Sequence, residues 1–326
     1  MWEHDSRLEE KPDYGKLGPA SEVRDGKPIT PQSRGLQAPW AVLSGVLMAL
    51  VFVGVNSGVA RAGWQRLTQF LPLQGKPDAA SPAILSRHES ERLNHEGAQQ
   101  QAELLLQRAI NHYDGATDEI ARRVEGWHGN LKLTPQLTAL ITTGLNSNDL
   151  HVRATSIEVD LAALNIEKTS ESVDRLQSQA QSGPKSQRIW ALWTLGLVGN
   201  RGVEPERVTQ ILSAGLRDAN PEIRQWAVEG MSYLGTDDTL EPMLKTFHDD
   251  PTPLVRERAA CGLAQSGMLN EQQRQSIVPR LIEFAEDGSL DPQTHSWVYH
   301  ALRDITAQNL PDNAAAWRGW YETAGR

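Results

Sequence analysis

Hydrophobic positions in the second half of the chain follow a helical period within a unit that recurs. The clearest copy, residues 221–235, opens with a proline in the first turn and closes on a glycine. Proline suits the first turn because its missing N–H costs nothing there, and glycine suits a left-handed C-terminal cap. Its apolar positions recur three and four residues apart, on one face of a predicted helix: Ala227, Val228, Met231 and Leu234.

Further copies of this unit occur on both sides. Residues 184–199 and 253–267 repeat the order of proline, arginine, apolar face and terminal glycine, a weaker copy covers 153–164 and a degenerate one 292–305. A second amphipathic helix precedes each copy. A helix pair of this size cannot bury its apolar face alone, so a period of roughly 32–40 residues predicts stacking of pairs. The predicted fold is all-α, an α-solenoid of stacked helix pairs.

The turn and helix start of the unit resemble the HEAT-repeat family. The residues that carry the resemblance are DANPEIRQWA and DDPTPLVRERA, with SGPKSQRIWALWTLGLVG as a fair third copy. The resemblance implies HEAT-like repeats over residues 131–310. It also implies that the signature arginine is structural and ties the helix start to a neighbouring turn. The positions that match this arginine are Arg153, Arg188, Arg224 and Arg256.

The N-terminal part has a different pattern. Residues 1–38 are polar and predict a disordered tail. Residues 39–61 contain the apolar run AVLSGVLMALVFVGV, between Trp40 and Trp64, and predict a single transmembrane helix. The alternative is a signal peptide cleaved after Ala62. The order of short tail, one segment and large domain resembles a signal-anchor. On that analogy we expect a bacterial inner-membrane protein, single-pass, with the solenoid on the periplasmic side.

Three further segments complete the predicted domain organisation. Residues 62–92 contain several prolines and predict a linker. Residues 93–130 predict two helices that cap the N-terminal end of the array, and residues 311–326 predict a C-terminal capping helix. The aromatic side chains of that last helix are expected to cover the open end of the final repeat: Trp317, Trp320 and Tyr321.

Charge and cysteine content exclude several classes of function. The net charge is −9, and residues 131–326 contain 18 Lys and Arg against 25 Asp and Glu. An acidic array is a poor phosphate-binding surface, so no nucleic-acid partner is expected. The single cysteine, Cys261, permits no intramolecular disulfide, and its simplest interpretation is a small buried side chain.

The candidate binding surface lies on the second helix of each pair. Positions two, five and nine residues after the signature arginine point away from the buried face, toward the expected concave side of the array. Aromatic residues and arginine at such positions are typical of interfaces. They predict a groove that binds a protein partner, although packing of these rings between repeats is the alternative. The groove residues are Trp190, Trp193, Trp226, Tyr233 and Arg258.

No pattern in the sequence predicts catalysis, and no cofactor or metal is expected. The run His248-Asp249-Asp250 could ligate a cation, but acidic residues at this turn also cap helices. We therefore predict a membrane-anchored scaffold or adaptor that is not an enzyme. The alternatives are a HEAT-like lyase or chaperone-type protein that handles a small aromatic ligand in the concave cleft, and a subunit that only braces a complex.

Overall fold

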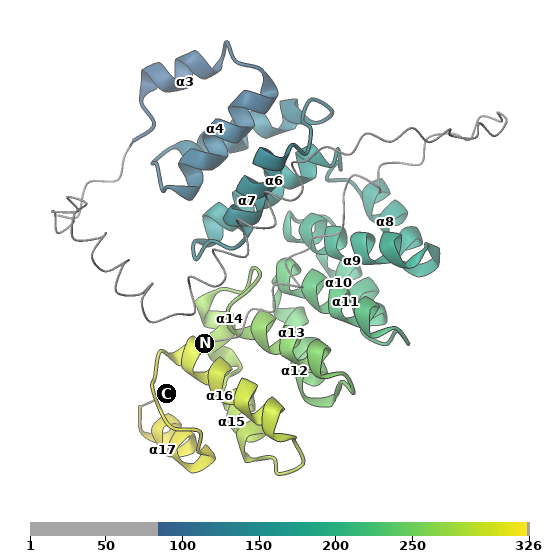
Figure 1. The fold of residues 1–326 in the computed structure, drawn as a ribbon, viewed down its shortest axis with the longest axis vertical. Helices are drawn as coiled ribbons and strands as arrows, with labels where there is room; N and C mark the ends of the chain where they lie inside the picture. The colour runs from purple at the N-terminus through teal and green to yellow at the C-terminus, as the bar shows by residue number, and fades with distance from the viewer. Residues whose placement is uncertain (1–83, 325–326) are drawn as a thin grey trace, which may run out of the picture. The chain divides into compact units, whose positions relative to one another are not determined.

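The computed structural model describes residues 84–324, and the regular elements of this range are all helices (Figure 1). The predicted tail (1–38), the predicted membrane segment (39–61) and most of the predicted linker (62–92) lie outside the described residues. Within the described range, no helix is both long enough and apolar enough to cross a membrane.

The described chain is built from antiparallel helix pairs. The first helices of the pairs are α6 (Pro135–Leu145), α8 (Ser170–Ser182), α10 (Pro205–Gly215), α12 (Leu240–Asp249) and α15 (Val278–Glu286). The second helices are α7 (Leu150–Ala163), α9 (Lys185–Asn200), α11 (Pro221–Leu234), α13 (Pro253–Ala264) and α16 (Pro292–Thr306). Each first helix packs against the second helix that follows it.

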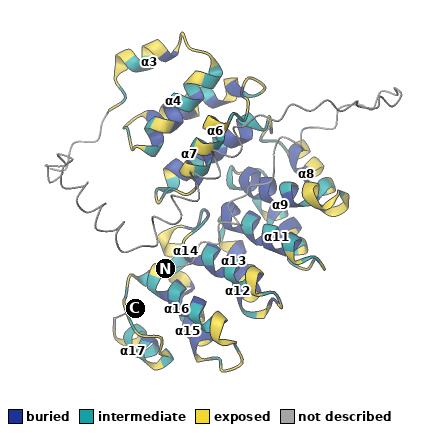
Figure 2. Ribbon diagram, viewed as in Figure 1, coloured by how far each residue is buried: buried dark blue, intermediate teal, exposed yellow. Residues whose placement is uncertain are grey.

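The second helices also pack on one another, which joins the pairs into a stack. Helix α9 packs along α11, α11 along α13, and α13 along α16 (Figure 1). Helices α9 and α11 are accordingly buried over most of their surface, whereas α8 has an exposed outer face (Figure 2). The described chain is therefore an all-α stack consistent with an α-solenoid.

Further helices lie before, between and after these pairs. They are α3 (Arg87–Leu93), α4 (Ala98–Ile110), α5 (Ala116–Arg123), η3 (Val124–Trp127), η4 (Asp237–Thr239), α14 (Glu271–Ser276) and α17 (Ala314–Ala324). Helices α4 and α5 pack on α6 and α7, and α17 packs on α15. The indole of Trp317 is fully buried and stacks edge-on against Trp320, with 5.9 Å between ring centroids. Helix α17 thus covers part of the last pair with an aromatic face.

Local sequence explains where α11 begins and ends. The Asn220 side chain accepts a hydrogen bond from the Glu222 amide and Pro221 occupies the first turn. Gly235 ends the helix with a φ of 64°, in the left-handed region that favours glycine. The equivalent end of α9 differs from the prediction. Gly199 lies inside the helix, where a Cβ atom added to it would be 2.7 Å from Leu234 Cδ1. The residue with a positive φ after this helix is Gly202 instead.

Candidate functional site

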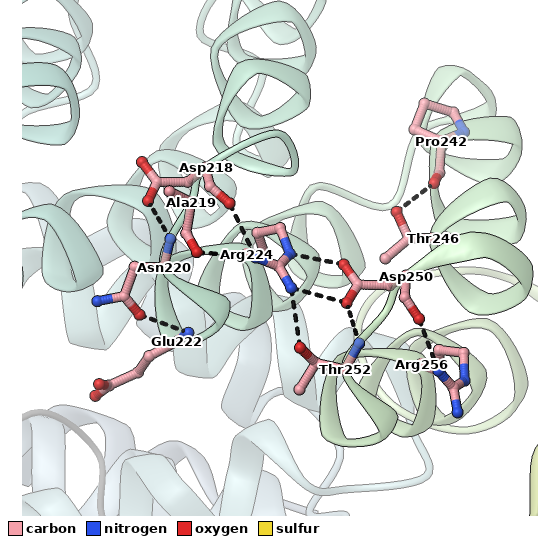
Figure 3. A network of polar contacts seen from close by, with 10 residues as sticks. All are labelled: Asp218, Ala219, Asn220, Glu222, Arg224, Pro242, Thr246, Asp250, Thr252 and Arg256. Carbon is pink, nitrogen blue, oxygen red and sulfur yellow. Dashed lines mark hydrogen bonds and ion pairs between the residues drawn. The ribbon is translucent and has the colours of Figure 1, made fainter.

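The signature arginines join neighbouring pairs at the starts of the second helices. The Arg224 guanidinium donates to both carboxylate oxygens of Asp250, at 2.7 and 3.0 Å, and to the hydroxyl of Thr252 (Figure 3). It also donates to the carbonyl of Asp218 in its own turn, at 2.9 Å. Asp250 lies in the turn of the next pair. Arg224 is therefore bonded to two successive turns at once.

The same arrangement repeats in the flanking pairs. Arg188 donates to the Ala180 carbonyl at 2.8 Å and pairs with the Asp218 carboxylate of the next turn. Arg256 donates to the Asp250 carbonyl at 2.7 Å and pairs with Asp291 at 2.8 Å. We call this row of three ion pairs the arginine ladder: Arg188–Asp218, Arg224–Asp250 and Arg256–Asp291.

The electrostatics of the ladder favour its charged form. The Asp250 carboxylate raises the pKa of Arg224 through direct hydrogen bonds. Burial tends to raise the pKa of Asp218, but hydrogen bonds from Arg188 and from the Asn220 amide outweigh it and hold this pKa below its usual range. Charge-assisted bonds of this kind are stronger than neutral ones, so the ladder fixes the spacing of successive pairs.

Arg153 departs from this pattern. Its guanidinium donates to the Ser147 carbonyl of its own turn, as the others do. The next turn, at Gly183 and Pro184, has no carboxylate to receive it. Instead the guanidinium donates to the carbonyl oxygens of Gln265, at 3.2 Å, and of Gly267, just beyond α13. The ladder is thus interrupted between α7 and α9.

The predicted groove residues do not form one exposed ridge. Trp190 and Trp226 are half-buried, and Arg258 is 17% exposed in its side chain, 3.4 Å from Glu229. Trp193 and Tyr233 are buried, with only 2% and 6% of their surface exposed. The exposure that we expected of these two side chains is therefore wrong. Their rings meet edge-on between α9 and α11, with centroids 6.4 Å apart, so they pack between repeats.

The cation-site candidate at residues 248–250 has another role in the structure. Asp250 belongs to the ladder, while the His248 ring lies between two carboxylates. Its Nδ1 is 2.5 Å from Asp249, and its Nε2 is 2.9 Å from Asp287 in the next pair. Across residues 84–324, no three His, Cys, Asp or Glu side chains are arranged to hold a metal ion.

The His248 contact makes this junction sensitive to pH. Burial opposes protonation of His248, but the Asp249 and Asp287 carboxylates outweigh it and raise its pKa above the ordinary value near 6.5. Hydrogen bonds from Ser289 and then His248 lower the pKa of Asp287 to about 2. Because the pKa of His248 is higher in the folded than in the unfolded protein, the charged His248 stabilises the fold at pH values below its unfolded pKa. This stabilisation is lost as the pH rises through the pKa of His248 in the folded protein.

We therefore expect His248→Gln to destabilise the protein more at pH 6 than at pH 9. Asp287 stays ionised over this range, so only the histidine charge changes. Thermal unfolding of both proteins across this pH range measures the difference. A deficit in melting temperature that is the same at pH 6 and pH 9 would show that the histidine charge contributes nothing.

Comparison with known families agrees with the helix-pair architecture. Residues 173–264 match the family model for HEAT repeats. The matched region begins within α8 and ends with α13. It contains two of the three ion pairs of the arginine ladder, Arg188–Asp218 and Arg224–Asp250. No curated protein matches the chain. The family match and the stacked pairs together support a HEAT-repeat domain, a class that commonly mediates protein–protein interaction.

Proposed function

We propose that the protein is a non-enzymatic, membrane-anchored scaffold whose HEAT-like array holds a protein partner near the bilayer. The observation that carries the proposal is the continuous stack of second helices that matches HEAT repeats. Stacked pairs create extended surfaces that no single pair has, and such surfaces suit macromolecular partners. Fold alone does not define a partner, so the binding residues have to come from the surface itself.

Two tryptophans are the strongest candidates for contact with that partner. Trp190 and Trp226 both stand two residues after a ladder arginine, in α9 and in α11, and both are half-buried. A tryptophan that keeps part of its ring accessible on a rigid helix is a typical binding hot spot. Trp193 and Tyr233 pack against each other between the same two helices. Arg258 lies on the next second helix, α13.

Alanine substitution of both tryptophans tests this assignment. We expect Trp190→Ala/Trp226→Ala to weaken partner capture from the producing cell at least about tenfold, since hot-spot truncation costs about 2 kcal/mol or more. Helical content should stay unchanged. Trp320→Ala, in the C-terminal cap, is the matched control. If the double variant and the control captured the partner equally well, Trp190 and Trp226 would not be part of the binding interface.

The anchor is the second part of the proposal, and the apolar run within residues 39–61 supports it. We propose a single-pass protein of a bacterial inner membrane, with the array on the periplasmic side. An alkaline phosphatase reporter, active only after export, fused after Arg326 should be active, whereas a fluorescent reporter that matures only in the cytoplasm should stay dark. The opposite pattern would place the array in the cytoplasm. Release of the array by high salt or carbonate would argue against an anchor.

A further inference from the structure

The first described pair, α6 and α7, is attached to the array differently from the others. Each later second helix packs along its successor, but α7 touches α9 at only a few points. The short link 164–169 connects α7 to α8, and Asn165 within it has a φ of 52°, in the left-handed region. Chain order alone would place α7 alongside α9. The structure places it elsewhere.

Helix α7 lies across the C-terminal ends of three second helices. Near its start, Arg153 donates to the Gln265 and Gly267 carbonyls, just beyond α13. Further along, Glu158 accepts from Arg201 at the end of α9, at 2.7 Å. Two residues after Glu158, Asp160 is buried and interacts electrostatically with Tyr233 near the end of α11. The helix thus bridges α13, α11 and α9.

Polar contacts from both ends of α7 help to hold it in this position. Arg153 is buried and donates only to carbonyl groups, and burial lowers its pKa. Arg201 and Glu158 keep 29% and 15% of their side chains exposed. Polar interfaces within one chain resemble transient protein–protein interfaces, and relative motion across them is the default expectation. Buried apolar side chains of α7 and of α9, α11 and α13 belong to one cluster, and close glycine contacts also join α9 to α11 and α11 to α13.

The N-terminal helices pack mainly on one another. Helices α4, α5, η3 and α6 pack around α7. Lys168 in the link binds Glu125 of η3 at 2.7 Å and Glu158 of α7 at 3.1 Å, so most of the link belongs to this block. These helices carry fully buried side chains that belong to the same buried cluster as those of the array: Leu105, Leu106, Ile120, Leu137, Ile141 and Ile157.

We propose that residues 84–168 are a detachable cover, with α7 as its docking helix, that closes the C-terminal ends of α9, α11 and α13. When the cover opens, the carbonyls of Gln265 and Gly267, the guanidinium of Arg201 and the phenol of Tyr233 become available together. A helix with an arginine and, five residues later, a carboxylate fits this surface, because that is the pattern of Arg153 and Glu158 in the present occupant. The cover closes this surface whether or not Trp190 and Trp226 bind a partner.

The native cysteine reports on opening. Cys261 lies on α13, is partly exposed and interacts electrostatically with Arg153, and burial raises the pKa of its thiol. The increase in its alkylation rate by iodoacetamide, relative to the full wild-type chain, therefore measures additional opening of the cover. Loss of Arg153 removes a neighbouring positive charge, which by itself disfavours the reactive thiolate. Faster alkylation of an Arg153 variant would therefore come from exposure.

Two variants and one control make the test. Arg201→Gln removes the ion pair with Glu158, and Arg153→Met/Arg201→Gln loosens both ends of α7. The control, Arg207→Gln, removes an arginine that pairs with Asp174 and Glu204, away from α7. We expect alkylation about tenfold faster in the double variant, an intermediate rate in Arg201→Gln and the wild-type rate in the control. Far-UV circular dichroism should be unchanged.

Hydrogen exchange separates local opening from unfolding. Under the proposal, amides in α10 and α12 keep their protection in the double variant while Cys261 reacts faster. The proposal is overturned if the double variant reacts at the wild-type rate. It is also overturned if faster alkylation appears only together with lost protection in α10 and α12, because the cover would then be an inseparable part of the fold.

Discussion

Replacing Arg224 by methionine should lower the free energy of unfolding by about 3 kcal/mol, because it leaves the buried Asp250 carboxylate without its charged partner. Arg224 and Asp250 keep only 10% and 5% of their side chains exposed. The Thr252 hydroxyl and the Asp218 carbonyl would lose a donor as well. Urea unfolding followed by far-UV circular dichroism measures the change.

The ladder position also predicts the form of this transition. Stability in a repeat array is roughly a sum of terms within repeats and between neighbours. Arg224→Met weakens one boundary, between the α10–α11 and α12–α13 pairs, so the urea transition should broaden or split as the two sides separate. Lys185→Met is the matched control. Lys185 pairs with Glu222 across the preceding boundary, but with 55% and 45% of these side chains exposed, so we expect a change within about 0.5 kcal/mol. Equal effects of the two substitutions would contradict a structural ladder.

Replacing Gly230 by alanine should destabilise the protein by about 2 kcal/mol or more, although alanine normally favours a helix over glycine by about 1 kcal/mol. A Cβ at Gly230 would lie 2.5 Å from the Leu192 carbonyl oxygen and 2.8 Å from Leu212 Cδ2. Gly196 of α9 faces Gly230 at the same crossing. Backbone lies against backbone here, so α9 and α11 would have to separate to admit one methyl group.

The control for this prediction is a glycine in an open helix position. A Cβ at Gly319 in α17 would meet nothing within 4 Å. Gly319→Ala should therefore stabilise the protein by up to about 1 kcal/mol. Opposite signs for the two substitutions, measured by thermal or urea unfolding, are the expected result. Stabilisation by Gly230→Ala would mean that α9 and α11 do not approach as closely as the structure places them.

Local sequence carried much of the information about the helix pairs. The proline at the first turn, the turn acid and the terminal glycine each act within a few residues. Helix α11 begins at Pro221 and ends at Leu234, just before Gly235, for these local reasons. The acidic partners of the arginines could also be anticipated as turn residues. Their pairing with the preceding repeat follows once the pairs stack, because the spacing repeats.

The candidate groove was harder to predict, since a helical wheel describes one helix and not its neighbours. Trp193 and Tyr233 are buried where their rings meet between α9 and α11, so a neighbouring second helix covers positions that were expected to be exposed. The displacement of α7 has one faint sequence signal: Gly183-Pro184 stands where the other turns carry an acid. The half-buried state of Trp190 and Trp226 depends on side-chain packing, which cannot be derived from the spacing of apolar residues along the sequence.

Site-specific photo-crosslinking tests the scaffold proposal most directly. A benzoylphenylalanine at position 226, in the full chain and in membranes of the producing cell, should form one discrete protein adduct. The same probe at the exposed Glu241, on first helix α12, should form none. The adduct should sediment with the membrane fraction. No adduct from position 226, or equal adducts from both positions, would contradict a scaffold that binds its partner through the second helices.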